Sequence, residues 1–420
     1  MLHFLIYDVL GTPAILVGLF SLIGLLLQKK GISDVISGTL KTIMGFVILT
    51  AGAGIIAYTL TIFSQLFEHS FHIQGVVPNT DAMAALAQKN YGTETATIMV
   101  LGMLINIALA RLTPLKYIFL TGHHTLYMAA MLAVILSVGG LSGGWVVAIG
   151  AVILGAMMVI SPAILQPFTR KITNIDDLAL GHFGSIGYLL SALVGKIIGK
   201  GSPSIEEIKV PKSLNFLRDS SVAISLTMMI LFLVLVLVAG KSFVEETLSA
   251  GQNFIIFAII QSLTFAAGVY IILAGVRMVI AEIVPAFKGI ADKLVKDAKP
   301  ALDCPTVFPF APNAVIVGFL ASFVAGLVSM FLCPLFGLSV IVPGLVPHFF
   351  CGATAGVYGN ITGGRRGAVV GAFAHGLLIS FLPAILLPMM GDMGLGSTTF
   401  GDADFGVVGI VLGHIIAMFN

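Results

Sequence analysis

The sequence predicts an all-α polytopic membrane protein, on the strength of its composition and of long apolar runs separated by short polar breaks. Of the 420 residues, 58% are hydrophobic and 10% charged, and the mean hydropathy is +1.08. Soluble domains carry about 25% charged residues, and a soluble fold of this length has too little interior for so much apolar surface. A bilayer removes that constraint because lipid is itself apolar.

The apolar runs predict roughly ten to twelve spanning helices. Residues 78–90 are too few and too polar to span. The N-terminal stretch has no basic region or cleavage site, so we expect a first spanning helix there and not a signal peptide. The predicted spans are residues 9–27, 43–67, 95–112, 117–138, 145–165, 178–198, 221–239, 254–284, 307–336, 338–358, 368–390 and 405–419.

The net charge is +2, with basic residues spread along the chain, so the composition gives no indication of nucleic-acid binding. The 48 glycines suit close helix packing in a membrane bundle. Three cysteines, Cys304, Cys333 and Cys351, lie in apolar surroundings without ligand spacing, and we expect buried free thiols.

We expect one integral membrane unit, 1–420, whose polar centre at 200–219 joins two halves, 1–199 and 220–420. Segments of the two halves can be aligned: 41–54 on 277–290, and 119–124 on 308–313. Internal repeats are the usual plan of solute carriers, and chance similarity of apolar segments is the alternative.

Two Lys-rich segments, 206–218 and 287–299, are amphipathic and suit the cytoplasmic membrane surface. Ordinary solvated loops or helix ends would give the same pattern.

Two histidines follow glycines at breaks in apolar runs, where a polar group without a partner is costly. A helix that restarts at Gly122 would point its N-terminus at an anion, and His123 beside it can exchange hydrogen bonds with a hydroxyl. His182 follows Gly181 in the same way. The alternatives are a buried histidine bonded to a carbonyl and an interfacial loop histidine.

Asp303 precedes three prolines, Pro305, Pro309 and Pro312, which prevent a regular helix. The freed backbone groups must line a cavity or be buried in protein, and a carboxylate there is a strong acceptor for sugar hydroxyls. A salt bridge at the membrane edge, with Lys299 close by, is the alternative.

A small-residue segment, 352–356, offers backbone amides and the hydroxyl of Thr354 for binding. Close helix packing by small residues is the alternative.

The sequence contains no GxxxxGK[ST], HExxH or CxxC motif. These absences exclude ATP hydrolysis through a phosphate-binding loop, and the sequence predicts no metal ion or cofactor.

Six short strings occur in the order expected of one family, over nearly the whole chain. Together they resemble the ascorbate-type IIC (permease) component of the bacterial phosphoenolpyruvate-dependent sugar phosphotransferase system. The strings are 38–46, 120–123, 275–282, 302–304, 310–314 and 349–354.

The resemblance implies a multi-pass homodimer in the lipid of the bacterial inner membrane, with roughly eleven spans, re-entrant segments and inverted repeats. Each protomer would have a core domain that moves against a V-motif domain, in the manner of an elevator. The substrate would be L-ascorbate, phosphorylated by a separate IIB protein that IIA recharges. The chain itself would be a transport component and not an enzyme.

The resemblance also implies the substrate-binding residues, and four positions depart from the expected pattern. Ala53 replaces a small hydroxyl residue, Asp81 a Tyr, and Tyr127 and Phe183 each a Gln. These departures leave a related sugar acid or a pentitol as alternative substrates. The implied binding residues are Thr80, Asp81, His123, Tyr127, His182, Phe183, Asp303, Ala353 and Thr354.

Two other functions compete with this one. An ion-coupled secondary carrier would use Glu282, Asp303 and His123 as a proton pathway. A membrane-embedded enzyme would use His123 and Asp303 as acid and base, but the sequence shows no nucleophile with a matched partner.

Overall fold

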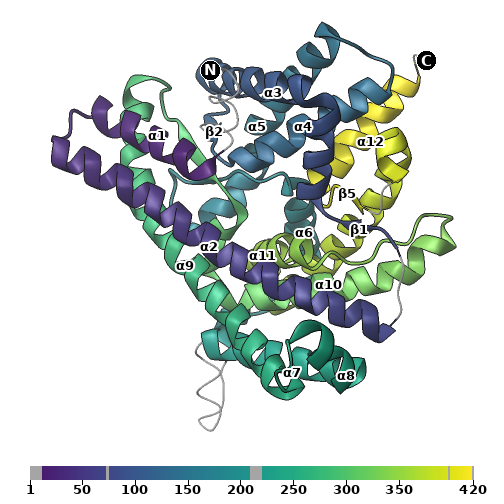
Figure 1. Cartoon of the computed structure of the whole chain (residues 1–420). Coiled ribbons are helices and arrows are strands. Elements are labelled where there is room, and N and C mark those ends of the chain that lie inside the picture. Colours follow the sequence, from purple (N-terminus) through teal and green to yellow (C-terminus); the bar gives the residue numbers. More distant parts are fainter. Residues whose placement is uncertain (1–11, 72–74, 209–219, 396–397, 419–420) are drawn as a thin grey trace.

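The computed structural model describes residues 12–71, 75–208, 220–395 and 398–418, and this part of the chain is mostly helical (Figure 1). The helices are α1 (Pro13–Leu27), α2 (Ile32–Phe71), α3 (Thr80–Leu112), α4 (Gly122–Val138), α5 (Gly144–Thr173), α6 (Ser185–Ile198), α7 (Ser220–Ala239), α8 (Lys241–Phe243), α9 (Phe254–Lys293), α10 (Pro312–Leu335), α11 (Leu345–Leu386) and α12 (Ala403–Ala417). The 3₁₀ helices are η2 (Ile205–Glu207), η5 (Cys304–Phe310) and η6 (Leu387–Leu395), and η4 (Val244–Leu248) is a short π-helix. The strands are β1 (Val77–Pro78), β2 (Tyr117–Phe119), β3 (Ala179–Leu180), β4 (Lys299–Leu302) and β5 (Thr398–Thr399).

Within the described residues, six helices are long and apolar enough to cross a membrane, or seven if the bent pair formed by 224–239 and 241–248 counts as one span. Four shorter apolar helices, α1, α4, α6 and α12, accompany them. The predicted all-α, multi-pass class is therefore confirmed. The count of roughly eleven spans stays a prediction.

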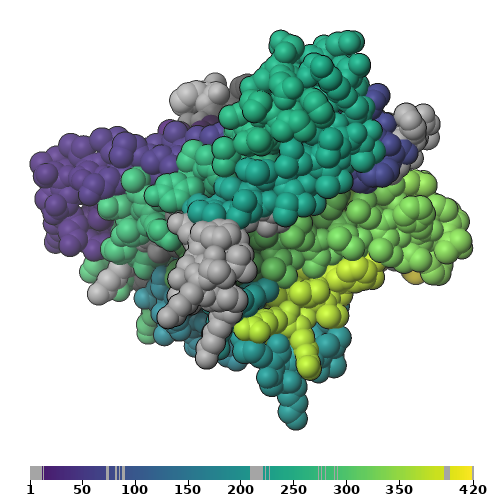
Figure 2. All heavy atoms as spheres, turned by 90° about the horizontal axis from the view of Figure 1, so that it is seen from below, coloured from purple at the N-terminus to yellow at the C-terminus, as the bar shows by residue number. Residues whose placement is uncertain are grey.

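Helices α2 and α9 run antiparallel and cross the molecule side by side (Figure 1). Their backbones meet at glycines with the same spacing in both helices: a Cβ at Gly45 would lie 2.9 Å from the Val279 nitrogen, and one at Gly52 would lie 2.7 Å from the Ile272 nitrogen. In α9, Gly275 packs in the same way against Leu49, and Gly268, seven residues before it, packs against Ile56 and Gly52. The corner of α1 and α2, purple in Figure 2, projects from the body beyond this contact.

Helices α3, α4 and α5 pack together, and α6, α10 and α11 form a second group beside them. Two long helices are broken inside. α3 has non-helical backbone at Tyr91, which separates the polar segment that we expected not to span from the apolar run after it. Most of each of the predicted spans 338–358 and 368–390 lies in α11 (Leu345–Leu386), which is broken at Gly363 and Gly364. Gly364 has a φ of 53°, a conformation that glycine adopts without steric cost.

The short strands pair in parallel across the two halves of the sequence. One sheet has the order β2-β4-β3, and the other joins β1 to β5. In the first sheet Phe119 lies opposite Ala301, and Leu180 lies opposite Leu302. This register places the residues that follow all three strands at one edge of the sheet.

The central polar segment is described up to residue 208; the rest of it, and most of the amphipathic stretch 206–218, lies outside the described residues. Glu206 accepts hydrogen bonds from the backbone nitrogens of Asn313 (3.2 Å) and Ala314 (2.9 Å), at the start of α10. Burial raises the pKa of Glu206, and these two amide bonds oppose the rise. The segment therefore ties the connection between the halves to α10.

The glycine contact between α2 and α9 predicts that Gly275→Ala destabilises the fold. A Cβ at Gly275 would overlap the Leu49 backbone nitrogen and approach the Gly45 carbonyl oxygen within 2.7 Å, so we expect a loss of about 1–3 kcal/mol in the free energy of unfolding. Gly54→Ala in α2 is the matched control, because nothing lies within 4 Å of a Cβ there. Thermal unfolding in detergent measures both, and equal melting temperatures for the two variants would contradict the packing argument.

Candidate functional site

The edge where β2, β4 and β3 end is the point at which the candidate residues meet. Thr121, Asp303 and Gly181 follow these strands at the same level. The Thr121 hydroxyl donates to the Gly181 carbonyl oxygen at 2.5 Å, and the Gly181 nitrogen donates to the Leu302 carbonyl oxygen at 2.7 Å. These bonds satisfy backbone groups that a helix would otherwise pair. The predicted breaks in the apolar runs are thus the ends of short buried strands.

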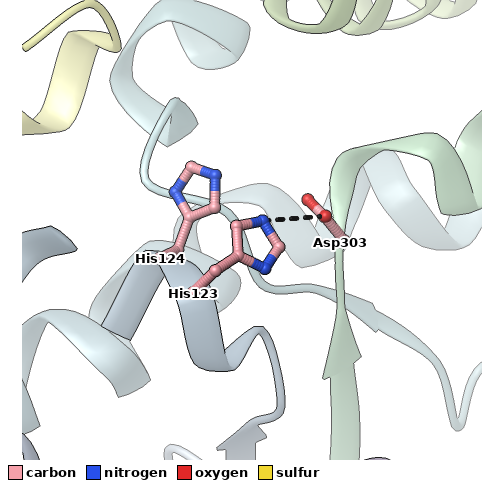
Figure 3. Close-up of side chains that lie close together, drawn as sticks. All are labelled: His123, His124 and Asp303. Carbon is pink, nitrogen blue, oxygen red and sulfur yellow. Dashed lines mark ion pairs between the residues drawn. The ribbon is translucent and has the colours of Figure 1, made fainter. Parts of the chain in front are cut away.

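His123 lies on the first turn of α4, which begins at Gly122, as predicted. Its Nε2 lies 3.4 Å from Oδ2 of Asp303, and the pair is charged on both sides when His123 is protonated (Figure 3). Oδ1 of Asp303 accepts a hydrogen bond from the Cys304 nitrogen at 2.7 Å and so caps η5. The predicted irregular structure after Asp303 is confirmed, because η5 is a 3₁₀ helix.

His182 approaches the other oxygen of the same carboxylate. Its Nε2 lies 3.7 Å from Oδ1 of Asp303, and its Nδ1 is hydrogen-bonded to the Tyr188 hydroxyl at 2.9 Å. Tyr188 is fully buried in the helix that follows, α6, and it therefore fixes the orientation of the imidazole. Asp303 consequently lies between two histidines that come from the first half of the chain.

Exposure differs across this group. The His123 side chain is 31% exposed and that of Asp303 12%, whereas the His182 side chain is 4% exposed. A solute would therefore meet His123 and Asp303 first. The first turn of α4 adds the positive end of its helix dipole, and together these groups offer donors and acceptors suited to a hydroxylated anion.

Of the other predicted binding residues, Tyr127 joins the group, with its ring 5.7 Å from the His123 ring. Phe183 is fully buried, and its ring stacks on that of Phe119 with the ring centroids 4.7 Å apart. Thr80 accepts a hydrogen bond from the Gly401 nitrogen at 3.1 Å. The side chain of Asp81 lies outside the described residues.

Ala353 and Thr354 are fully buried in α11. Thr354 donates to the Phe350 carbonyl oxygen at 2.7 Å, and α11 packs against η5, the element that follows Asp303 in sequence. The flanking glycines pack against α10: a Cβ at Gly352 would lie 2.7 Å from the Ser322 hydroxyl oxygen. Residues 352–356 therefore pack closely against α10, and α11, the helix that contains them, also contacts the element that follows Asp303. The three cysteines are free and buried, as predicted.

Sequence reasoning missed three residues near the strand ends. His124 is 5% exposed and lies with its Nδ1 4.0 Å from Oδ2 of Asp402. Asp404 accepts hydrogen bonds from the Ser185 hydroxyl at 2.6 Å and from the Ile186 nitrogen at 2.8 Å, and so caps α6. Asp402 and Asp404 directly precede the last apolar run. Carboxylates in this position usually cap a helix at the membrane edge, so nothing in the sequence indicated that they are buried.

The comparison with known families decides what kind of protein carries this site. The model of the PTS system sugar-specific permease component family matches residues 8–404. The chain belongs to this family. The family resemblance seen in the sequence is thereby confirmed, and this permease is a transport component, as predicted, and not an enzyme.

One curated relative is similar to this permease over most of the length of the permease. It is the "Ascorbate-specific PTS system EIIC component" of Mycoplasma pneumoniae (strain ATCC 29342 / M129 / Subtype 1), which is 28% identical over 421 residues. The match covers 86% of this chain and 63% of the relative, so the permease spans less than two thirds of the length of that protein.

The cap on α6 predicts that Asp404→Asn destabilises the permease. The amide group of Asn would set a donor against the donors of Ser185 and Ile186, and we expect a loss of about 1–3 kcal/mol. Asp177→Asn, at an exposed carboxylate before β3, is the control. Thermal unfolding in detergent measures the difference, and an Asp404→Asn variant as stable as its control would refute the capping role.

Proposed function

We propose that this permease carries L-ascorbate, or a closely related sugar acid, across the bacterial inner membrane in a process coupled to phosphorylation. The observation that carries the proposal is the Asp303 carboxylate held between His123 and His182, at 3.4 and 3.7 Å. The family and the name of the curated relative support the substrate class.

The site combines the two kinds of group that ascorbate requires. Asp303 accepts hydrogen bonds from the side-chain hydroxyls of the substrate, away from the charge on its ring. His123, at the start of α4, faces the anionic ring together with the positive end of the helix dipole. Tyr127, one turn further on, is a hydroxyl donor in place of the amide expected there.

The position of the site supports an inverted repeat. His123 and His182 belong to residues 1–199, whereas Asp303 and Thr354 belong to 220–420, and transporter sites typically lie between two repeats. The antiparallel pair α2 and α9, with glycines equally spaced in both helices, supports the same symmetry. We propose that the helices around the site form the core domain and that α2 and α9 belong to the V-motif domain.

Uptake proceeds by an elevator movement of the core domain against the V-motif domain of a homodimer of roughly eleven-span protomers. The substrate is then phosphorylated by a separate IIB protein, which IIA recharges. Because the phosphorylated product is a different solute, it does not return through the same site. The departures at Ala53 and Asp81 keep a related sugar acid or a pentitol as the alternative cargo.

Substitution of the central carboxylate tests the site. We expect Asp303→Asn to weaken L-ascorbate binding by at least tenfold, because the hydroxyl acceptor loses its charge and its pairing with His123. Binding of labelled ascorbate to the purified protein in detergent measures the effect. Asp292→Asn, at an exposed carboxylate near the end of α9, should bind as the unmodified protein does. Unchanged affinity in the Asp303→Asn variant would remove Asp303 from the site.

Reconstitution tests the coupling. Vesicles that contain the permease should accumulate labelled ascorbate phosphate when phosphorylated IIB is supplied, and should not accumulate label when IIB is unphosphorylated. Uptake that is independent of phosphorylated IIB and collapses with the proton gradient would instead establish an ion-coupled carrier.

A further inference from the structure

A second group of potential ligands lies behind the sugar site. His124, His182 and Asp402, here called the inner cluster, are all buried and offer ligand atoms within 4.8 Å of one another. They come from α4, from the turn after β3, and from the residue before α12. The rings of His124 and His182 lie 3.9 Å apart. Of these three residues, the sugar site uses His182 alone.

His124 carries the observation that points to a ligand. Its Nδ1 is buried and has no hydrogen-bond partner, although the side chain is 6% exposed. A buried polar atom without a partner is costly, and this nitrogen lies 4.0 Å from Oδ2 of Asp402, beyond hydrogen-bonding distance. A cation bound between these two atoms would give the His124 nitrogen the partner that it lacks.

In His182 and Asp402, the other two members of the inner cluster, a second polar atom is hydrogen-bonded to a neighbouring side chain, as is common for metal ligands. Nδ1 of His182 is hydrogen-bonded to the Tyr188 hydroxyl at 2.9 Å, which leaves its Nε2 on the side of the cluster. Oδ1 of Asp402 accepts a hydrogen bond from the Cys351 thiol at 3.1 Å. These contacts fix both side chains while one ligand atom of each stays directed at the cluster.

We propose that the inner cluster binds one divalent transition-metal ion of the zinc type. Two imidazole nitrogens and one carboxylate oxygen are a donor set that zinc accepts, with a fourth position left for water or a solute. Zinc–ligand bonds of about 2.0–2.2 Å in tetrahedral geometry place ligand atoms about 3.4 Å apart. The separation of His124 from Asp402 therefore contracts by less than about 1 Å on binding, which side-chain rotation can supply.

Metal titration of the purified full-length protein, without any sugar, tests this proposal. Equilibrium dialysis against zinc chloride should give one ion per chain, and His124→Gln and Asp402→Asn should each weaken binding at least tenfold. Gln keeps much of the bulk of His124 and so preserves the packing around it. His414→Ala is the control, because His414 is exposed on α12 and its Nδ1 lies 2.8 Å from the Ile410 carbonyl oxygen. Saturable binding that His124→Gln leaves unchanged, or no saturable binding by the unmodified protein, would overturn the proposal.

Cobalt(II) provides a second measurement that needs no variant. Cobalt bound to the inner cluster should show the intense visible absorption of a four-coordinate ion, and zinc should displace it. A weak spectrum typical of six-coordinate cobalt would contradict the proposal. The result is independent of the sugar proposal, because Asp303 and ascorbate take no part in either experiment.

Discussion

The parallel pairing of three short strands is the constraint on which the rest of the site depends. β2, β4 and β3 exchange backbone hydrogen bonds between segments that are far apart in sequence. Where apolar surroundings exclude water, non-helical backbone is tolerated only when its polar groups are paired in this way. Because the strands are parallel, Thr121, Asp303 and Gly181 meet at one edge, and a slip of one residue would turn the side chains to the opposite face.

The sequence predicted the helical class, the restart of a helix at Gly122 and the irregular segment after Asp303, because each follows from local properties of the chain. It did not predict the strands. Residues 117–138 and 178–198 were read as single spans, yet each begins with a buried strand and continues as a helix. By hydropathy alone a short buried strand cannot be distinguished from the first turn of a helix, and the partner of both strands lies in the other half of the chain.

The residues near the strand ends were predicted unequally for a related reason. His123, His182 and Asp303 interrupt apolar runs, and such interruptions are visible in a sequence. Asp402 and Asp404 open a run, which is also how a helix at the membrane edge begins. Their burial depends on β5 pairing with β1 and on α6 approaching the start of α12, and these long-range contacts have no local signature.

Two of the carboxylates near the strand ends, Asp303 and Asp402, lie in different surroundings. Asp303 faces the more exposed His123, a position suited to a solute that must arrive and leave, whereas Asp402 faces the buried His124, a position suited to a small ion. His182 belongs to the sugar site and to the inner cluster. Because its Nδ1 is hydrogen-bonded to Tyr188, its Nε2 is left to interact either with Asp303 or with a bound metal ion, one at a time. Occupation of the inner cluster would therefore withdraw His182 from Asp303. Because such coupling is reciprocal, bound sugar would weaken metal binding by the same factor as bound metal weakens sugar binding.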